Sequence, residues 1–161
     1  MWLTQGGEAT RQAYDTFHPD LKIKHEQQFF YKQLTHYFDK PNKRLYVHGG
    51  INRHKKVSEQ NSGIFKWDRD LFMAAMANNI RTEDDKIMFP FKTKDDIEEI
   101  FIGHTATTAW KVDEPINAPP VWNLDTGAGW SGKLTIMDVD TKEFWQSDKV
   151  QNLYPKIKGR K

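Results

Sequence analysis

The sequence predicts an α/β protein in which helices flank a mixed sheet. Two short apolar runs, Leu45–Val47 and Ile100–Ile102, are typical of buried strands. Between them, the segment Trp67–Asn78 has apolar residues at helical spacing. The segment Lys133–Gln146 alternates apolar and polar residues, as strands do. Strands interleaved with helices favour an α/β architecture.

The N-terminal segment is expected to be helical. A short helix is predicted to begin near Thr4–Glu8 and to end before Pro19. A second helix is predicted to stop at Pro41, because apolar residues before it share one helical face. These residues are Phe30, Leu34, Tyr37 and Phe38.

The central segment holds the first strand and the third helix. After Leu45–Val47, the polar and basic segment Asn52–Ser62 is predicted to be a loop over the site. The third helix is predicted to begin at Trp67–Asp70, with acidic residues in its first turn. Asp95–Glu99 is predicted to form one helical turn that leads into the strand Ile100–Ile102.

The segment after this strand is expected to be irregular until a third strand. Trp110–Pro120 has no periodic pattern, and Pro119 and Pro120 are predicted to fix an extended approach to Val121–Leu124. The glycine-rich segment Asp125–Gly132 is predicted to be a turn between two strands.

The chain is predicted to end in a hairpin and a tail. Lys133–Val139 and Glu143–Gln146 are the predicted strands, and Asp140–Lys142 is the turn between them. The tail from Lys149 is polar and is expected to be loose. We find no repeat and no linker, so residues 1–161 are predicted to form a single domain, with a polar tail at 149–161.

Composition restricts the class of protein. At 161 residues, with 37% hydrophobic and 29% charged residues, the chain suits a globular domain. It has no cysteine, so any metal must be held by His, Asp, Glu or Asn side chains. No apolar run approaches the roughly 20 residues that span a bilayer, and no secretory signal pattern is present. We therefore expect a cytoplasmic protein. The net charge of +2 permits anionic substrates without indicating nucleic acid.

Two histidines lie at the carboxyl ends of predicted strands, where open α/β sheets bind ligands. His48 follows Leu45–Val47, and His104 follows Ile100–Ile102 and Gly103. A single histidine in such a place is more often a hydrogen-bonded structural group, but two in similar settings favour a shared metal, for which neutral imidazole is a suitable ligand. The other histidines are expected at the surface: His18, His25, His36 and His54.

Two further features have a structural and a functional interpretation. Arg69 is either a helix-surface arginine or a bidentate clamp on phosphate oxygens. The glycines of Asp125–Gly132 either form a simple turn or let the backbone approach a ligand closely.

Five short motifs occur in an order that resembles the calcineurin-like metallophosphoesterases, and most closely their bacterial and phage phosphoprotein phosphatase branch. The motifs are Tyr46-Val47-His48-Gly49-Gly50-Ile51, Trp67-Asp68-Arg69-Asp70, Ile102-Gly103-His104-Thr105, Asn123-Leu124-Asp125-Thr126-Gly127-Ala128 and Ser131-Gly132-Lys133-Leu134-Thr135. The resemblance covers nearly the whole chain, with residues 1–41 resembling the family's helical insert and residues 42–148 its sheet and site.

The resemblance implies a dinuclear site for Mn, Fe or Zn between two mixed sheets flanked by helices. It implies that His48 and His104 are metal ligands and that Arg69 binds the substrate phosphate. Asp125 would be a structural partner near the site, with Gly103 and Thr105 beside it. The implied reaction is phosphoester hydrolysis of the serine/threonine phosphatase type, by attack of a metal-activated hydroxide on phosphorus.

The chain departs from the family by lacking three motifs. It contains no Gly-Asp-x-His-Gly, no Gly-Asp-x-x-Asp-Arg-Gly and no Gly-Asn-His-Glu. Those motifs supply the remaining metal ligands, so the chain resembles the C-terminal half of the family sandwich, and we expect it to be inactive, or nearly so, by itself.

Three alternatives stay open. The chain belongs to a dinucleotide polyphosphate hydrolase of the same superfamily, or it is a non-catalytic interaction module in which both histidines only form hydrogen bonds. A nucleic-acid role is the weakest, because the basic runs lack interleaved aromatic residues. The expected partners are a phosphorylated substrate, a phosphoprotein or a small phosphoester, and a second copy that completes the sheet in a homo-oligomer.

Overall fold

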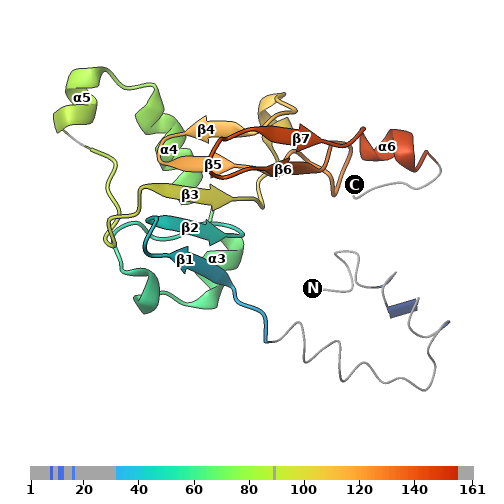
Figure 1. The fold of residues 1–161 in the computed structure, drawn as a ribbon, viewed down its shortest axis with the longest axis horizontal. Coiled ribbons are helices and arrows are strands. Elements are labelled where there is room, and N and C mark those ends of the chain that lie inside the picture. Colours follow the sequence, from blue (N-terminus) through green and yellow to red (C-terminus); the bar gives the residue numbers. More distant parts are fainter. Residues whose placement is uncertain (1–7, 9–10, 13–15, 17–31, 89, 156–161) are drawn as a thin grey trace.

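The computed structural model describes residues 8, 11–12, 16, 32–88 and 90–155. Within them, a five-stranded mixed sheet and a separate two-stranded hairpin form the body of the molecule (Figure 1). The predicted α/β class, a mixed sheet with flanking helices, is therefore confirmed.

The strands of the main sheet follow the order β1-β2-β3-β5-β4. The central strands β2, β3 and β5 are parallel, and the two outer strands are antiparallel to their neighbours. The strands of this sheet are β1 His36–Asp39, β2 Arg44–Val47, β3 Glu99–Ile102, β4 Ile116–Ala118 and β5 Val121–Asn123. The hairpin consists of β6 Thr135–Met137 and β7 Phe144–Gln146.

The helices in the described part of the chain are short. They are α3 Ser62–Trp67, α4 Asp70–Asn79, α5 Glu83–Met88 and α6 Val150–Leu153, with 3-10 turns at Val57–Glu59 and Thr107–Trp110. Asn61 caps α3, since its side chain accepts hydrogen bonds from Gly63 N–H and Ile64 N–H. No helix in this part is long and apolar enough to cross a membrane.

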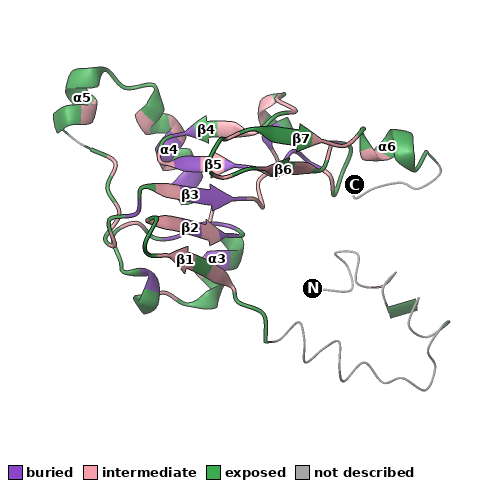
Figure 2. Ribbon diagram, viewed as in Figure 1, coloured by how far each residue is buried: buried purple, intermediate pink, exposed green. Residues whose placement is uncertain are grey.

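One face of the sheet packs against α3 and α4. Leu45 of β2, Ile100 of β3 and Val121 of β5 are neighbours in register, and all three are fully buried. Phe65 of α3 and Phe72 of α4 belong to the same buried cluster. Figure 2 shows the buried residues concentrated on these central strands and the helices behind them. Burial of each such side chain contributes about 1.5–3 kcal/mol, so this layer holds the strand ends in place.

The opposite face carries a row of aromatic rings. Tyr46 of β2 stacks on Phe101 of β3 with 5.1 Å between ring centroids, and Tyr37 of β1 stacks on Tyr46 at 6.0 Å. The Lys142 ammonium, from the turn between β6 and β7, lies 5.2 Å from the centroid of the Phe101 ring. The hairpin therefore covers part of this face.

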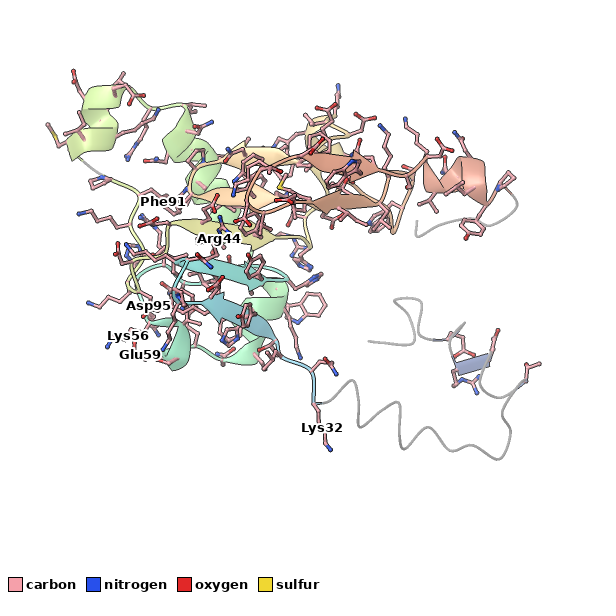
Figure 3. The ribbon with its side chains drawn as sticks, viewed as in Figure 1. Lys32, Arg44, Lys56, Glu59, Phe91 and Asp95 are labelled. Atoms are coloured by element: carbon pink, nitrogen blue, oxygen red, sulfur yellow. The ribbon has the colours of Figure 1, made fainter. Side chains whose placement is uncertain are left out.

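The loop after β2 is tied to the segment before β3. Val57 N–H donates to the Asp95 carboxylate at 2.6 Å, and Lys56 N–H donates to the Glu59 carboxylate at 3.2 Å. Figure 3 shows Lys56, Glu59 and Asp95 at this junction. The predicted loop Asn52–Ser62 thus contains a 3-10 turn, and its last residue already belongs to α3.

The second predicted helix is wrong where the structure describes it. Tyr37 and Phe38 lie on β1, which pairs with β2, and Phe30 lies outside the described residues. Four apolar residues at helical spacing form only a short pattern. Antiparallel pairing with the largely buried strand β2 outweighs it. In the first predicted helix, Glu8, Arg11, Gln12 and Thr16 are helical, and the rest lies outside the described residues.

Two predictions around β3 and β5 are also wrong. Asp95–Glu99 forms a turn rather than a helical turn, because Asp96 has a left-handed φ of 52° and Glu99 is already in β3. The expected irregular segment Trp110–Pro120 contains β4, and Pro119 and Pro120 form the turn between β4 and β5. Pairing of β4 with β5 fixes this segment, which has no periodicity of its own.

The hairpin was predicted correctly, whereas the first part of the tail is more ordered than expected. β6 and β7 lie within the two predicted strands and pair antiparallel, with Ile136 opposite Trp145. The tail from Lys149, expected to be loose, forms α6 over Val150–Leu153, and Val150 N–H donates to Gly132 O at 3.0 Å. Residues 156–161 lie outside the described residues.

Candidate functional site

Three side chains meet at the carboxyl edge of the parallel strands. His48 follows β2 directly, His104 is the second residue after β3, and Asp125 is the second residue after β5. Since β2 and β5 both pair with β3, these residues come from adjacent strand ends. This edge is where the sequence predicted a shared site.

The two imidazoles are in direct contact. Nε2 of His48 lies 3.1 Å from Nδ1 of His104, and the ring centroids are 4.9 Å apart. The backbone supports this contact, because Gly103 N–H donates to His48 O at 2.9 Å. His104 has a left-handed φ of 68°, which is uncommon for a residue with a side chain. The backbone turn at His104 brings its ring to the end of β2.

The junction between α3 and α4 brings two more side chains to the pair. Gly49 N–H donates to Phe65 O at 2.6 Å, and a Cβ on Gly49 would lie 2.9 Å from Asp68 N. Only glycine permits this close approach. Trp67, at the end of α3, has its ring edge against His104 with 5.4 Å between centroids. The exposed Arg69 lies near enough for its charge to act on His104.

The loop after β5 completes the arrangement. Asn123 is fully buried, and its side-chain amide donates to Thr105 O at 2.8 Å, which connects this loop to the one that carries His104. Thr107 N–H donates to Asp125 O at 2.7 Å, and the Asp125 carboxylate accepts from Gly127 N–H at 3.0 Å. Asp125 is thereby fixed beside Gly103, where a Cβ would lie 3.8 Å from that of Asp125.

His104 is held in its neutral form. Burial lowers its pKa below the usual 6.5, the charge of Arg69 and the neighbouring His48 imidazole lower it further, and Asp125 opposes them. The Nε2 atom of His104 is buried, and it has no hydrogen-bond partner among the described residues. A neutral imidazole with an unpaired buried nitrogen is chemically suited to be a metal ligand.

The chain offers only part of a metal site. In the described segments, no group of three or more His, Asp or Glu side chains is arranged to hold a metal ion. A divalent ion takes at least four ligands, of which His48 and His104 would supply two. Further ligands would have to come from water or from groups outside this set.

The structure brings the predicted site residues together. His48, His104 and Arg69 form one cluster, and Gly103, Thr105 and Asp125 support it through their backbones. Their roles as metal ligands, phosphate clamp and structural partners stay predictions. Sequence reasoning had not assigned Trp67 to the site. Its place in the motif Trp67-Asp68-Arg69-Asp70, next to the candidate phosphate-binding Arg69, could have indicated it.

The other histidines are not part of this site. His54 is exposed, as predicted. His36 is not a simple surface residue, because it is half-buried and its ring lies 4.2 Å from the Phe65 ring. Pairing of β1 with β2 brings it over α3, which its polar context did not reveal. His18 and His25 lie outside the described residues.

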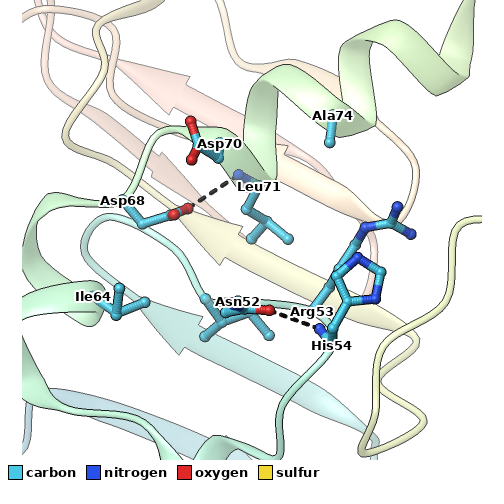
Figure 4. Close-up of a pocket in the computed structure, with 9 residues that line it drawn as sticks. Asn52, Arg53, His54, Ile64, Asp68, Asp70, Leu71 and Ala74 are labelled. Atoms are coloured by element: carbon cyan, nitrogen blue, oxygen red, sulfur yellow. Dashed lines mark hydrogen bonds between the residues drawn. The ribbon is translucent and has the colours of Figure 1, made fainter.

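A cavity of about 370 Å³ lies behind the segment that carries Arg69 (Figure 4). Asn52, Arg53 and His54 line it from the loop, so the predicted loop borders this cavity. Asp68 lines it too, and its carboxylate accepts from Leu71 N–H at 3.0 Å. Burial raises the Asp68 pKa above 3.8, and the charge of Asp70 adds to this, although the Leu71 N–H opposes it.

Comparison with known proteins gives one partial similarity. No family model matches the chain. A stretch of 52 residues is 44% identical to the symmetrical bis(5'-nucleosyl)-tetraphosphatase of Pseudomonas fluorescens (strain SBW25). This stretch is 32% of the chain and only 16% of that protein's length. The similarity is weak and partial, and it connects the chain with a hydrolase of the calcineurin-like metallophosphoesterase superfamily.

Proposed function

We propose that this chain forms the histidine-bearing part of a metal-dependent phosphoester hydrolase. The observation that carries the proposal is the 3.1 Å contact between His48 Nε2 and His104 Nδ1 at the carboxyl edge of three parallel strands. The partial similarity to a hydrolase named for a bis-nucleosyl tetraphosphate supports the same general reaction, attack of water at phosphorus.

His48 and His104 would hold a divalent metal, with Mn, Fe and Zn as the candidates. When bound, a pair of such ions lowers the pKa of coordinated water and neutralises charge on the phosphoryl group. The lowered pKa of His104 keeps its ring neutral, so the metal need not compete with a proton at neutral pH.

Arg69 would bind the phosphoryl oxygens. It is exposed and near enough for its charge to act on His104, and a guanidinium can give two parallel hydrogen bonds to a phosphate. Asp125 is a positioning residue in this scheme. Its backbone bonds order the loop, and its carboxylate partly offsets the charge of Arg69 at His104.

We infer that the substrate is a dinucleoside polyphosphate, because the partially similar hydrolase is named for a bis-nucleosyl tetraphosphate. A serine/threonine phosphatase is the second candidate, supported by the order of the five sequence motifs. The test measures manganese-dependent hydrolysis of two substrates by the full protein. One substrate is a bis-nucleosyl tetraphosphate and the other is a phosphoserine peptide. Preference for the peptide would reverse the assignment.

Metal binding can be tested on the 161-residue chain by calorimetric titration with Mn²⁺ or Zn²⁺. We expect His48→Ala and His104→Ala to weaken binding at least about tenfold, because each removes a ligand. His54→Ala, at an exposed histidine outside the pair, is the control and should bind as the wild type does. Equal heats in all four proteins would contradict the metal site and favour the interaction-module alternative.

The chain by itself should hydrolyse p-nitrophenyl phosphate poorly with Mn²⁺, because two imidazoles leave most of the coordination to water. Rapid manganese-dependent turnover by the 161-residue chain, abolished by His104→Ala, would show that the described residues suffice for catalysis.

A further inference from the structure

The helix α5 stands apart from the body of the molecule. Figures 1 and 2 show it beyond the end of α4, almost wholly exposed. None of its six residues is buried. Three large apolar side chains in and just before this helix are nevertheless exposed: Ile80 is 86% exposed, Ile87 78% and Met88 70%. Such a concentration of uncovered apolar surface is typical of an interaction site.

We call the exposed segment of residues 80–88, which contains α5, the arm. A groove lies at its base. A cavity of about 210 Å³ is lined by Arg53, Ala74, Ala77, Asn78, Arg81 and Phe91. It adjoins the larger cavity beside Asp68, because Arg53 and Ala74 line both. Ala74 and Ala77 are one helical turn apart on α4, so their small side chains leave room for another helix to approach.

The arm and the groove carry opposite charges. The first turn of α5 consists of Glu83, Asp84 and Asp85. The groove is basic, because Arg53 and Arg81 line it, and Arg53 lies over the Phe91 ring at 4.7 Å from its centroid. An acidic apolar helix and a basic groove lined by small residues are complementary surfaces.

We propose that α5 of one copy of this chain lies in the groove between Arg53 and Ala77 of a second copy. In the same dimer, α5 of the second copy lies in the corresponding groove of the first. Both surfaces are on every chain and close together, so one two-fold axis satisfies both at once. The apolar residues of α5 would then be covered by Ala77 and Phe91, and its acidic residues would face the arginines that line the groove. The proposal does not depend on metal binding or on the proposed reaction.

The absence of cysteine allows a direct test. Ile87→Cys and Ala77→Cys chains are prepared separately, mixed in equal amounts and oxidised gently, and intact mass identifies the products. A disulfide between the two different chains is expected as the main dimer. Ile136→Cys, at an equally apolar residue that is 62% exposed on the hairpin, replaces Ile87→Cys in the control mixture. Its yield should be at least about tenfold lower.

Equal yields in the two mixtures would overturn the proposal. So would a dominant disulfide between two Tyr37→Cys chains, because Tyr37 lies on the edge strand β1 and this product would indicate sheet completion. A double variant with Ile87→Cys and Ala77→Cys that forms only a monomeric disulfide would show that α5 folds back on its own groove, which also contradicts exchange.

Sedimentation equilibrium tests the charge complementarity. Asp84→Lys and Arg53→Glu are each expected to weaken self-association several-fold, and the two changes in one chain should restore it. Higher salt should weaken the wild-type dimer. A wild type that stays monomeric at every concentration, or a double variant no better than the single ones, would contradict the proposal.

Discussion

The two ends of the parallel strands β2 and β3 differ in how their charges are paired. At the amino end, Arg44 donates to Glu99 at 2.8 Å and to Asp140 at 2.5 Å, and Lys142 also pairs with Glu99. Figure 3 places Arg44 there, between the sheet and the hairpin. At the carboxyl end, two imidazoles share one contact, and the buried Nε2 of His104 has no hydrogen-bond partner in the described part of the chain.

This difference supports the proposal that the carboxyl end is the functional end. At the amino end, each of the half-buried charges is paired with an opposite one, and these pairs anchor the β6–β7 turn to the sheet. The carboxyl end leaves a buried polar nitrogen unpaired, which costs free energy of folding. Groups held in such unfavourable states are concentrated at functional sites. The comparison therefore favours the histidine end as the place where this fold acts.

Gly49→Ala should have the largest effect on stability. The added Cβ would lie 2.9–3.0 Å from backbone atoms of residues 66–68, which cannot move aside without shifting the junction that carries Trp67. We expect a loss of about 2–3 kcal/mol in the free energy of unfolding, measured by urea denaturation. Gly129→Ala is the matched control, because its Cβ would meet nothing within 4 Å. Equal stability of the two variants would mean that the junction is not tightly packed against β2.

Glu99→Gln should have an intermediate effect at the amino end. Burial tends to raise the pKa of Glu99, but hydrogen bonds and charges from Lys142 and Arg44 outweigh it, so the pKa is lowered from 4.5. A lowered pKa in the folded state means that the carboxylate stabilises the fold above the unfolded-state pKa, and that this stabilisation is lost as the pH falls through the folded-state pKa. We expect the variant to be less stable by about 1–2 kcal/mol at pH 7.

The difference between Glu99→Gln and wild type should disappear in acid. Denaturation series between pH 7 and pH 2 would measure it. Glu98→Gln, at a more exposed partner of Lys43, should show a smaller loss. A pH-independent difference would indicate that shape, rather than charge, accounts for the effect of Glu99.

Asp68→Asn should have the smallest effect and the opposite sign. Burial raises the Asp68 pKa above 3.8, so the folded state binds more protons than the unfolded state in the interval above that value. Stability is therefore lost as the pH rises through this interval. The amide can still accept from Leu71 N–H, so the variant should be more stable than wild type at pH 7 by less than about 1 kcal/mol. Wild type being the more stable at pH 7 would contradict this.

Local sequence patterns predicted the elements that are buried or strongly periodic. The strands that lead to His48 and His104, the helix after Arg69 and the β6–β7 hairpin all lie where the patterns indicated. Each has an apolar pattern that only one secondary structure can bury. The patterns failed at β1 and β4, which are edge strands defined by pairing with a neighbour rather than by their own periodicity.

The sequence by itself determined which residues stand at the strand ends, because a strand followed by histidine and glycine specifies a position along the chain. It could not determine that Nε2 of His48 would lie 3.1 Å from Nδ1 of His104, that Trp67 would pack on that ring, or that one imidazole nitrogen would be buried without a partner. Those facts depend on contacts between residues more than 30 positions apart. Such contacts are set by parallel strand pairing and by the close approach of α3 to Gly49, and only the folded chain brings them about.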